Sequence, residues 1–211
     1  MANTLAARLR AFFTALANPG KPNFYKLVTE HFFEGLETFI ANGGTFDPQA
    51  VYKGDLTQAM IIATLTHDAG LKIFVANGGT FNPQAVTEDG WTEAMVVAAS
   101  ERSALFSDEA RALKIFVANG GTFNAQAVTE DGQTEATIIA KCVGIEGLKV
   151  FVTNGGVLNE NDERIITASL KERRENGDRA IEHLDVEEFL LSLRPLPAAK
   201  APDAPDTPAP R

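Results

Sequence analysis

The sequence predicts an all-α protein built as an array of repeated helical units. The pattern Asn-Gly-Gly recurs at intervals of 35, 42 and 35 residues, beginning at Asn42, Asn77, Asn119 and Asn154. Residues 71–94 are also nearly identical to residues 113–136. Periods of about 20 to 50 residues are typical of arrays in which each unit buries its apolar face against its neighbours. We therefore expect a stack of about four to five helix-turn-helix units.

The first helix of each unit is predicted to begin at a threonine. Thr57 opens TQAMIIATL, Thr92 opens TEAMVVAAS and Thr134 opens TEATIIAKC. A threonine hydroxyl commonly accepts a hydrogen bond from the first turn of a helix, which makes this residue a good N-cap. Each helix also carries an alanine at the same position, where a neighbouring helix can approach closely: Ala63, Ala98 and Ala140.

The second helix is predicted to follow as GLKIFVANGG or a close variant. Its apolar residues recur with helical spacing and predict one buried stripe in each unit, made of Leu71, Phe74 and Val75, then Leu113, Phe116 and Val117, then Leu148, Phe151 and Val152. Glycine adopts the left-handed conformation that closes a helix at little cost. These helices should therefore end at Gly78, Gly120 and Gly155.

A protruding loop is predicted after each pair of helices. A single large apolar residue follows the glycines, and a polar stretch then ends in Asp-Gly at residues 89–90 and 131–132. Asp-Gly is typical of the tight turns that join hairpin strands. We therefore expect hairpin-like loops between the units.

The repeated unit resembles the ankyrin repeat. DGWTEAMVVAAS, LKIFVANGG and TFN stand in the order of that family's Asp-Gly-x-Thr turn, its two helices, and its hydrophobic residue followed by Asn. The resemblance covers about residues 22–158 and implies an ankyrin-like helical solenoid. The family's Thr-Pro-Leu-His is replaced here, for example by Thr-Glu-Ala-Met, and residues 102–108 lengthen one connection by seven residues. These departures concern the stacking angle more than the architecture.

The two ends of the chain differ in composition from the repeats. Residues 1–21 predict an amphipathic N-terminal capping helix; a secretory signal is the alternative, but the apolar run is short for one. Residues 159–194 predict C-terminal capping helices, of which the first is heavily charged. Residues 195–211 are rich in Pro and Ala, lack enough apolar surface to form a core, and are expected to be disordered.

The resemblance implies that a partner binds the concave surface formed by the loop tips and first helices. Trp91 is the leading candidate, because Trp is enriched among residues that anchor protein interfaces. The alternative is that Trp91 packs on its neighbouring loop, with Pro83 or Gln133. The expected partner-binding residues are Trp91, Gln133, Leu56, Lys53, Glu88, Asp89, Glu130, Asp131 and Lys141.

The charge of the chain favours a basic protein partner. A formal net charge of −9 disfavours nucleic acid or an anionic membrane, since both are polyanions. Stacking should align repeated carboxylates into an acidic strip, made of Glu88, Asp89, Glu93, Glu130, Asp131 and Glu135. The alternative for each of these carboxylates is a solvated position in a loop or in a first helical turn.

No catalytic pattern is evident in the sequence. Cys142 is the only cysteine, and no Cys-His or Ser-His-Asp arrangement can be identified, so that a buried structural thiol is expected. LDVEEFLLSL lacks the acidic loop that a calcium-binding helix pair needs upstream of it. We expect a non-catalytic, monomeric, cytoplasmic protein-binding module without metal or cofactor. A secreted effector is the main alternative, and a spacer or an enzyme is less favoured.

Overall fold

A computed structural model describes residues 23–101, 110–175 and 185–193. These residues form eight helices and no strand, so the prediction of an all-α protein is confirmed. In chain order the helices are α2 (Phe24–Ala41), α3 (Gln58–Ala76), α4 (Glu93–Glu101), α5 (Arg111–Ala118), α6 (Glu135–Cys142), α7 (Ile145–Thr153), α8 (Glu160–Glu175) and α9 (Val186–Leu193). The predicted N-terminal capping helix, the insertion at 102–108 and the tail at 195–211 lie outside the described residues.

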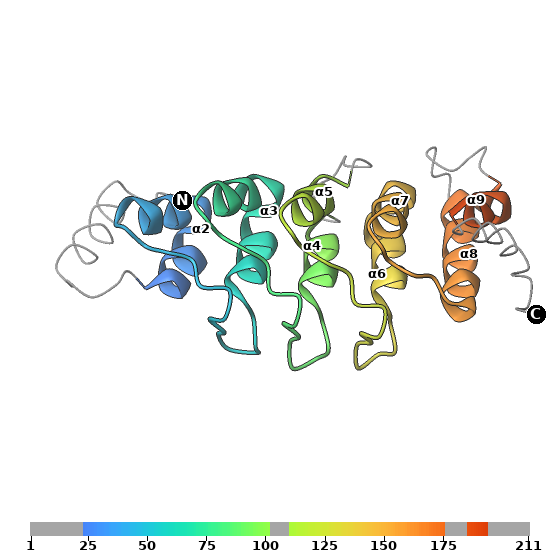
Figure 1. The fold of residues 1–211 in the computed structure, drawn as a ribbon, viewed down its shortest axis with the longest axis horizontal. Coiled ribbons are helices and arrows are strands. Elements are labelled where there is room, and N and C mark those ends of the chain that lie inside the picture. The colour runs from blue at the N-terminus through green and yellow to red at the C-terminus, as the bar shows by residue number, and fades with distance from the viewer. Residues whose placement is uncertain (1–22, 102–109, 176–184, 194–211) are drawn as a thin grey trace, which may run out of the picture.

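The helices lie side by side in chain order. Figure 1 shows α2 and α3, then the pairs α4 with α5, α6 with α7, and α8 with α9, as a single row. Contacts follow the same order, because α3 packs on α2 and α4, and α6 packs on α4 and α8. The connections before α3, α4 and α6 project from one side of this row as long loops (Figure 1). We call the contact between neighbouring helical units a seam.

Each of the first two units forms one kinked helix rather than two separate short helices. The kink in α2 falls at Phe32, with φ of 49°, and the kink in α3 falls at His67, with φ of 53°. The corresponding residue between α6 and α7 is Gly144, with φ of 80°. A left-handed φ in a non-glycine residue is costly, so the kinks in α2 and α3 could not be expected from residue type.

The predicted threonine caps are confirmed in the structure. The Oγ1 atoms of Thr57, Thr92 and Thr134 each accept a hydrogen bond, at 3.2 Å, from the backbone N–H three residues further on. In α6 the cap is reciprocal, because the Thr137 hydroxyl oxygen accepts from the Thr134 backbone N–H at 2.9 Å. These first helices therefore begin where the sequence predicts.

Each residue of Asn-Gly-Gly closes the second helix in its own way. In the third copy, Asn119 Nδ2 donates to the Ile115 carbonyl oxygen at 2.7 Å. Gly120 has a left-handed φ of 85°, as predicted for the helix end. Gly121 leaves room for an aromatic ring, because a Cβ atom there would lie 2.5 Å from Phe116. The same three features recur in the other copies.

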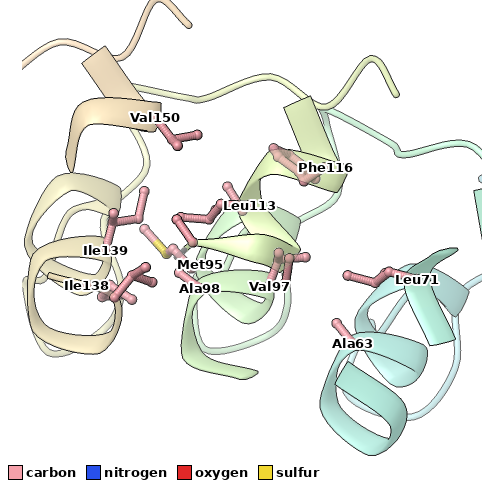
Figure 2. Packing of buried hydrophobic residues seen from close by; sticks show 14 of the residues in the cluster. Ala63, Leu71, Met95, Val97, Ala98, Leu113, Phe116, Ile138, Ile139 and Val150 are labelled. Carbon is pink, nitrogen blue, oxygen red and sulfur yellow. The ribbon is translucent and has the colours of Figure 1, made fainter. Parts of the chain in front are cut away.

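A row of phenylalanine rings runs through the core from one unit to the next. Rings on the second helices alternate with rings that follow the glycines, and successive centroids lie 4.7 to 5.9 Å apart. In order the ring row is Phe39, Phe46, Phe74, Phe81, Phe116, Phe123 and Phe151. Aliphatic side chains fill the rest of each seam; Leu113 and Met95, for example, lie between the α4–α5 pair and Ile139 of α6 (Figure 2). The core is therefore one continuous cluster.

The last seam is built differently from those before it. Leu158 stands at the position of Phe46, Phe81 and Phe123, and the ring row ends at Phe151. α8 begins at Glu160, immediately after Asn159, so no long loop separates α7 from α8. α9 packs on α8 and buries Phe189 and Leu190.

One helix among the described residues, α3, is long and apolar enough by length and composition to cross a membrane. Half of its apolar window is buried inside the protein. The fully buried residues Ile62 and Leu71 belong to the common core, which accounts for much of its apolar character.

Candidate partner-binding surface

Three loops of matching construction stand on one side of the row. We call residues 46–57 loop 1, residues 81–92 loop 2 and residues 123–134 loop 3. Each is closed by an isolated antiparallel bridge, which joins Val51 to Thr57, Val86 to Thr92, and Val128 to Thr134. The predicted hairpin-like loops are therefore confirmed, although the pairing is too short to form a strand.

The tips of loops 2 and 3 are acidic and lie next to one another. Glu88, Asp89, Glu130 and Asp131 are all exposed. The Glu130 backbone N–H donates to the Asp89 carbonyl oxygen at 3.1 Å, which joins the two tips directly. In loop 1 the exposed Lys53 occupies the position of Glu88 and Glu130, and its charge offsets that of the exposed Asp55, so the tip of loop 1 carries no net negative charge.

Leu56, Trp91 and Gln133 occupy the same position in the three loops, immediately before the capping threonine. All are half-buried, and Leu56 and Trp91 pack against the core. Gln133 lies beside another predicted residue, since its Oε1 accepts a hydrogen bond from the exposed Lys141 Nζ at 2.8 Å. Trp91 therefore exposes only part of its indole ring to solvent.

Glu93 and Glu135 do not belong to the predicted acidic strip. They are 3% and 1% exposed, respectively, so their inclusion in the strip was wrong. Both lie in the first turn of a helix, on the face that turns toward the preceding unit. A carboxylate in a first helical turn is usually solvated, and the sequence contains no local sign that this turn faces a seam.

The two buried carboxylates bridge neighbouring units. Glu93 Oε1 accepts from the Thr57 hydroxyl of the preceding unit at 2.6 Å, and its Oε2 accepts from the Asn82 N–H of its own loop at 2.7 Å. Glu135 repeats this arrangement with Thr92 at 2.5 Å and Asn124 at 2.7 Å. We call Glu93 and Glu135 the seam carboxylates.

Burial dominates the acidity of these groups. Desolvation raises the pKa of Glu93 to about 7, although its hydrogen bonds from Thr57 and Asn82 act in the opposite direction. Burial likewise raises the pKa of Glu135. The pKa of Glu101 is also raised by burial, while N–H groups at the start of α5, including that of Leu113 at 2.9 Å, favour its ionised form.

The structure adds a row of apolar residues that sequence reasoning missed. Val51, Val86 and Val128 are 58%, 42% and 50% exposed, one at the same position in each loop. The available signal was the repeated Ala-Val pair, in which Ala85 and Ala127 are buried and the following valine points outward. The valine row and the acidic tips together make a surface that is both apolar and negatively charged.

The remaining candidate residues offer little chemistry. Cys142 is half-buried and packs against the core, so it is less buried than the buried structural thiol that the sequence predicts. Within the described ranges, no group of three or more His, Cys, Asp or Glu side chains could hold a metal ion. A cleft of about 350 Å³ lies at the last seam and is mainly apolar, with Val152, Val157, Leu158 and Leu193 among its lining residues.

In comparisons with known proteins, no family model matches the chain and no curated protein matches it.

Proposed function

We propose that the chain is an ankyrin-like solenoid that binds another protein through loops 1 to 3 and has no catalytic role. The observation that carries this proposal is the valine row. Most large apolar side chains of the same repeats are buried or half-buried, whereas each loop exposes one valine at an equivalent position. Exposed apolar residues that lie together commonly mark an interaction site, and a polar rim is typical of such sites.

The charge around the valine row supports a partner with basic residues. The acidic tips carry four exposed carboxylates, those of Glu88, Asp89, Glu130 and Asp131, and the chain as a whole is acidic. Complementary charge mainly accelerates and orients association, while desolvated apolar anchors supply much of the affinity. We therefore assign anchoring to the valines and Trp91, and orientation to the acidic tips.

The test compares proteins captured from a native cell lysate by the immobilised intact chain and by a loop variant, Val86→Ser with Val128→Ser. Both side chains are exposed, so the variant should keep its fold, which thermal unfolding would check. The matched control is Val157→Ser, because Val157 is 61% exposed but lies outside the three loops.

We expect one or more proteins to be retained by the intact chain and by Val157→Ser, and lost from the loop variant. Added salt should slow association with that partner, because the acidic tips are exposed to solvent. Equal recovery of every protein by all three chains would contradict binding through the valine row.

A further inference from the structure

The seams on either side of α4 each enclose a carboxylate without a cationic partner. All four oxygen atoms of Glu93 and Glu135 accept hydrogen bonds from neutral groups, namely two threonine hydroxyls and two backbone amides. An ionised carboxylate that loses water without gaining a positive neighbour is strongly disfavoured. The same group in its protonated form is tolerated far better.

We propose that Glu93 and Glu135 act as proton-dependent latches, which hold loops 2 and 3 against the seams when protonated and release them when ionised. The 2.6 Å distance between Glu93 Oε1 and Thr57 Oγ1 is compatible with a hydrogen bond in both the protonated and the ionised form of Glu93. The hydroxyl donates to a carboxylate, and a protonated carboxyl group donates to the hydroxyl oxygen. Release breaks the bonds to Asn82 and Asn124 and allows water to solvate the charge.

No charged neighbour alters this argument for Glu93. The elements packed against α4 are α3, α5 and α6, and loop 2 leads into it. Loop 1 also packs here, because its Thr57 contacts Glu93. In the described residues, the charged or titratable groups of these elements and of α4 itself are Asp47, Tyr52, Lys53, Asp55, His67, Asp68, Lys72, Glu88, Asp89, Glu101, Arg111, Lys114, Glu135, Lys141 and Cys142. The raised pKa of Glu93 follows from burial and is opposed only by the hydrogen bonds from Thr57 and Asn82.

The surroundings of Glu135 are similar. α6 packs on α4, α7 and α8. Loop 2 also contacts Glu135, through Thr92. The charged groups near the starts of these helices and in loops 2 and 3 are Glu88, Asp89, Glu93, Glu130, Asp131, Glu146, Lys149, Glu160, Asp162, Glu163 and Arg164. Here too the raised pKa follows from burial, opposed only by the hydrogen bonds from Thr92 and Asn124.

The sign of the pH effect follows from the raised pKa. In the folded chain the pKa of Glu93 is about 7, against 4.5 for an unperturbed Glu. A carboxyl group with a raised folded pKa contributes its full stabilisation below the unperturbed value, and this is lost as the pH rises through the folded value. The Glu93 latch is therefore closed near pH 5 and opens as the pH approaches and passes 7. The Glu135 latch opens in the same direction, because burial raises its pKa too.

Loop 1 contains an internal reference for the two latches. Gln58 takes the position of the seam carboxylates, and its Oε1 accepts from the Asp47 N–H at 2.8 Å. The side chain of Gln58 does not titrate, yet it holds the corresponding amide of its loop. Its seam should therefore remain closed over the whole pH range.

The test is hydrogen exchange of single backbone amides, followed by NMR between pH 5 and pH 8 and corrected for intrinsic exchange at each pH. Protection of the Asn82 amide should fall more than about tenfold over this range, since the shift of Glu93 spans more than two pH units. Asn124 should lose protection in the same direction, and Asp47 should change little. Glu93→Gln should abolish the pH dependence at Asn82 and preserve it at Asn124.

Three results would overturn the proposal: protection of Asn82 that is constant within about twofold, an equal loss at Asp47, or an unchanged pH dependence at Asn82 in Glu93→Gln. The reverse variant, Gln58→Glu, keeps the test open if Glu93→Gln fails to fold. It should make protection of the Asp47 amide fall with rising pH, and a flat profile in this variant would also contradict the latch.

Discussion

Two seams share the same threonine–carboxylate bridge but differ in their loops. The seam between α4 and α6 has a long loop, and the seam between α6 and α8 has none. In the first, Glu135 lies 11 residues after Asn124 and links that residue's N–H to the Thr92 hydroxyl. In the second, Asp162 lies only 3 residues after Asn159 and links its N–H to the Thr134 hydroxyl, at 3.1 and 2.7 Å. The second seam therefore has the same bridge without a hairpin.

This difference separates two roles that the middle units combine, namely joining neighbouring units and exposing a projecting loop. The last seam stays closed without a projecting loop, so a loop is not needed to join neighbouring units. Loops 1 to 3 nevertheless keep equivalent exposed valines. A feature that stacking does not require is more readily explained by contact with something outside the chain, which agrees with the proposed function.

The two seams should differ most in how much stability the side chain of the ring row contributes to each. Phe116 is fully buried between Phe81 and Phe123, so Phe116→Ala should lower the free energy of unfolding by about 3–5 kcal/mol. Leu158→Ala removes a half-buried side chain at the last seam and should cost about 1–2 kcal/mol. Urea denaturation measures both, and equal losses would mean that the ring row does not distinguish the seams.

The threonine bridges should show an intermediate effect that is similar at both seams. Thr92→Val removes the hydroxyl that donates to buried Glu135, and Thr134→Val does the same for buried Asp162. Each should cost about 1–3 kcal/mol, because a buried acceptor loses its partner and a helix loses its cap. Serine at either position keeps the hydroxyl and is the control. A loss at only one of the two threonines would show that the bridge is not shared.

The smallest expected effect is a gain of stability at the last seam. Leu158→Phe would extend the ring row beyond Phe151 and into the apolar cleft of about 350 Å³. We expect the free energy of unfolding to increase by about 0.5–1.5 kcal/mol, which is typical of an added aromatic pair. The reciprocal change, Phe123→Leu, should destabilise the preceding seam. A destabilised Leu158→Phe chain would indicate that the cleft cannot accept the ring.

Sequence reasoning predicted much of the repeat and its local signals. Thr57, Thr92 and Thr134 cap helices where expected, and Gly78, Gly120 and Gly155 adopt the left-handed conformation. These signals are local, because a residue's own conformational preference determines them. The exposed acidic tips could be anticipated for the same reason, since Asp-Gly indicates a turn and turns lie at the surface.

The parts that could not be predicted depend on the neighbouring unit. Whether Glu93 meets water or the Thr57 hydroxyl is decided by how α4 docks on the preceding unit. The kink at His67 is held by tertiary context, including a contact of 3.1 Å between His67 Nδ1 and the Ser100 carbonyl oxygen. The half-burial of Trp91 likewise follows from packing against the core. Such contacts cannot be predicted from local sequence patterns, because they depend on how neighbouring units stack.

The threonine–carboxylate bridge also bears on how long such a protein can be. Every unit from α4 to α6 offers a threonine to the unit after it and a carboxylate to the unit before it. A duplicated copy of residues 93–134 would begin with a carboxylate for the threonine before it and end with a threonine for the carboxylate after it. Deleting residues 93–134 would likewise leave a threonine in one unit facing a carboxylate in the next. The number of units could consequently change without requiring a new kind of contact between them.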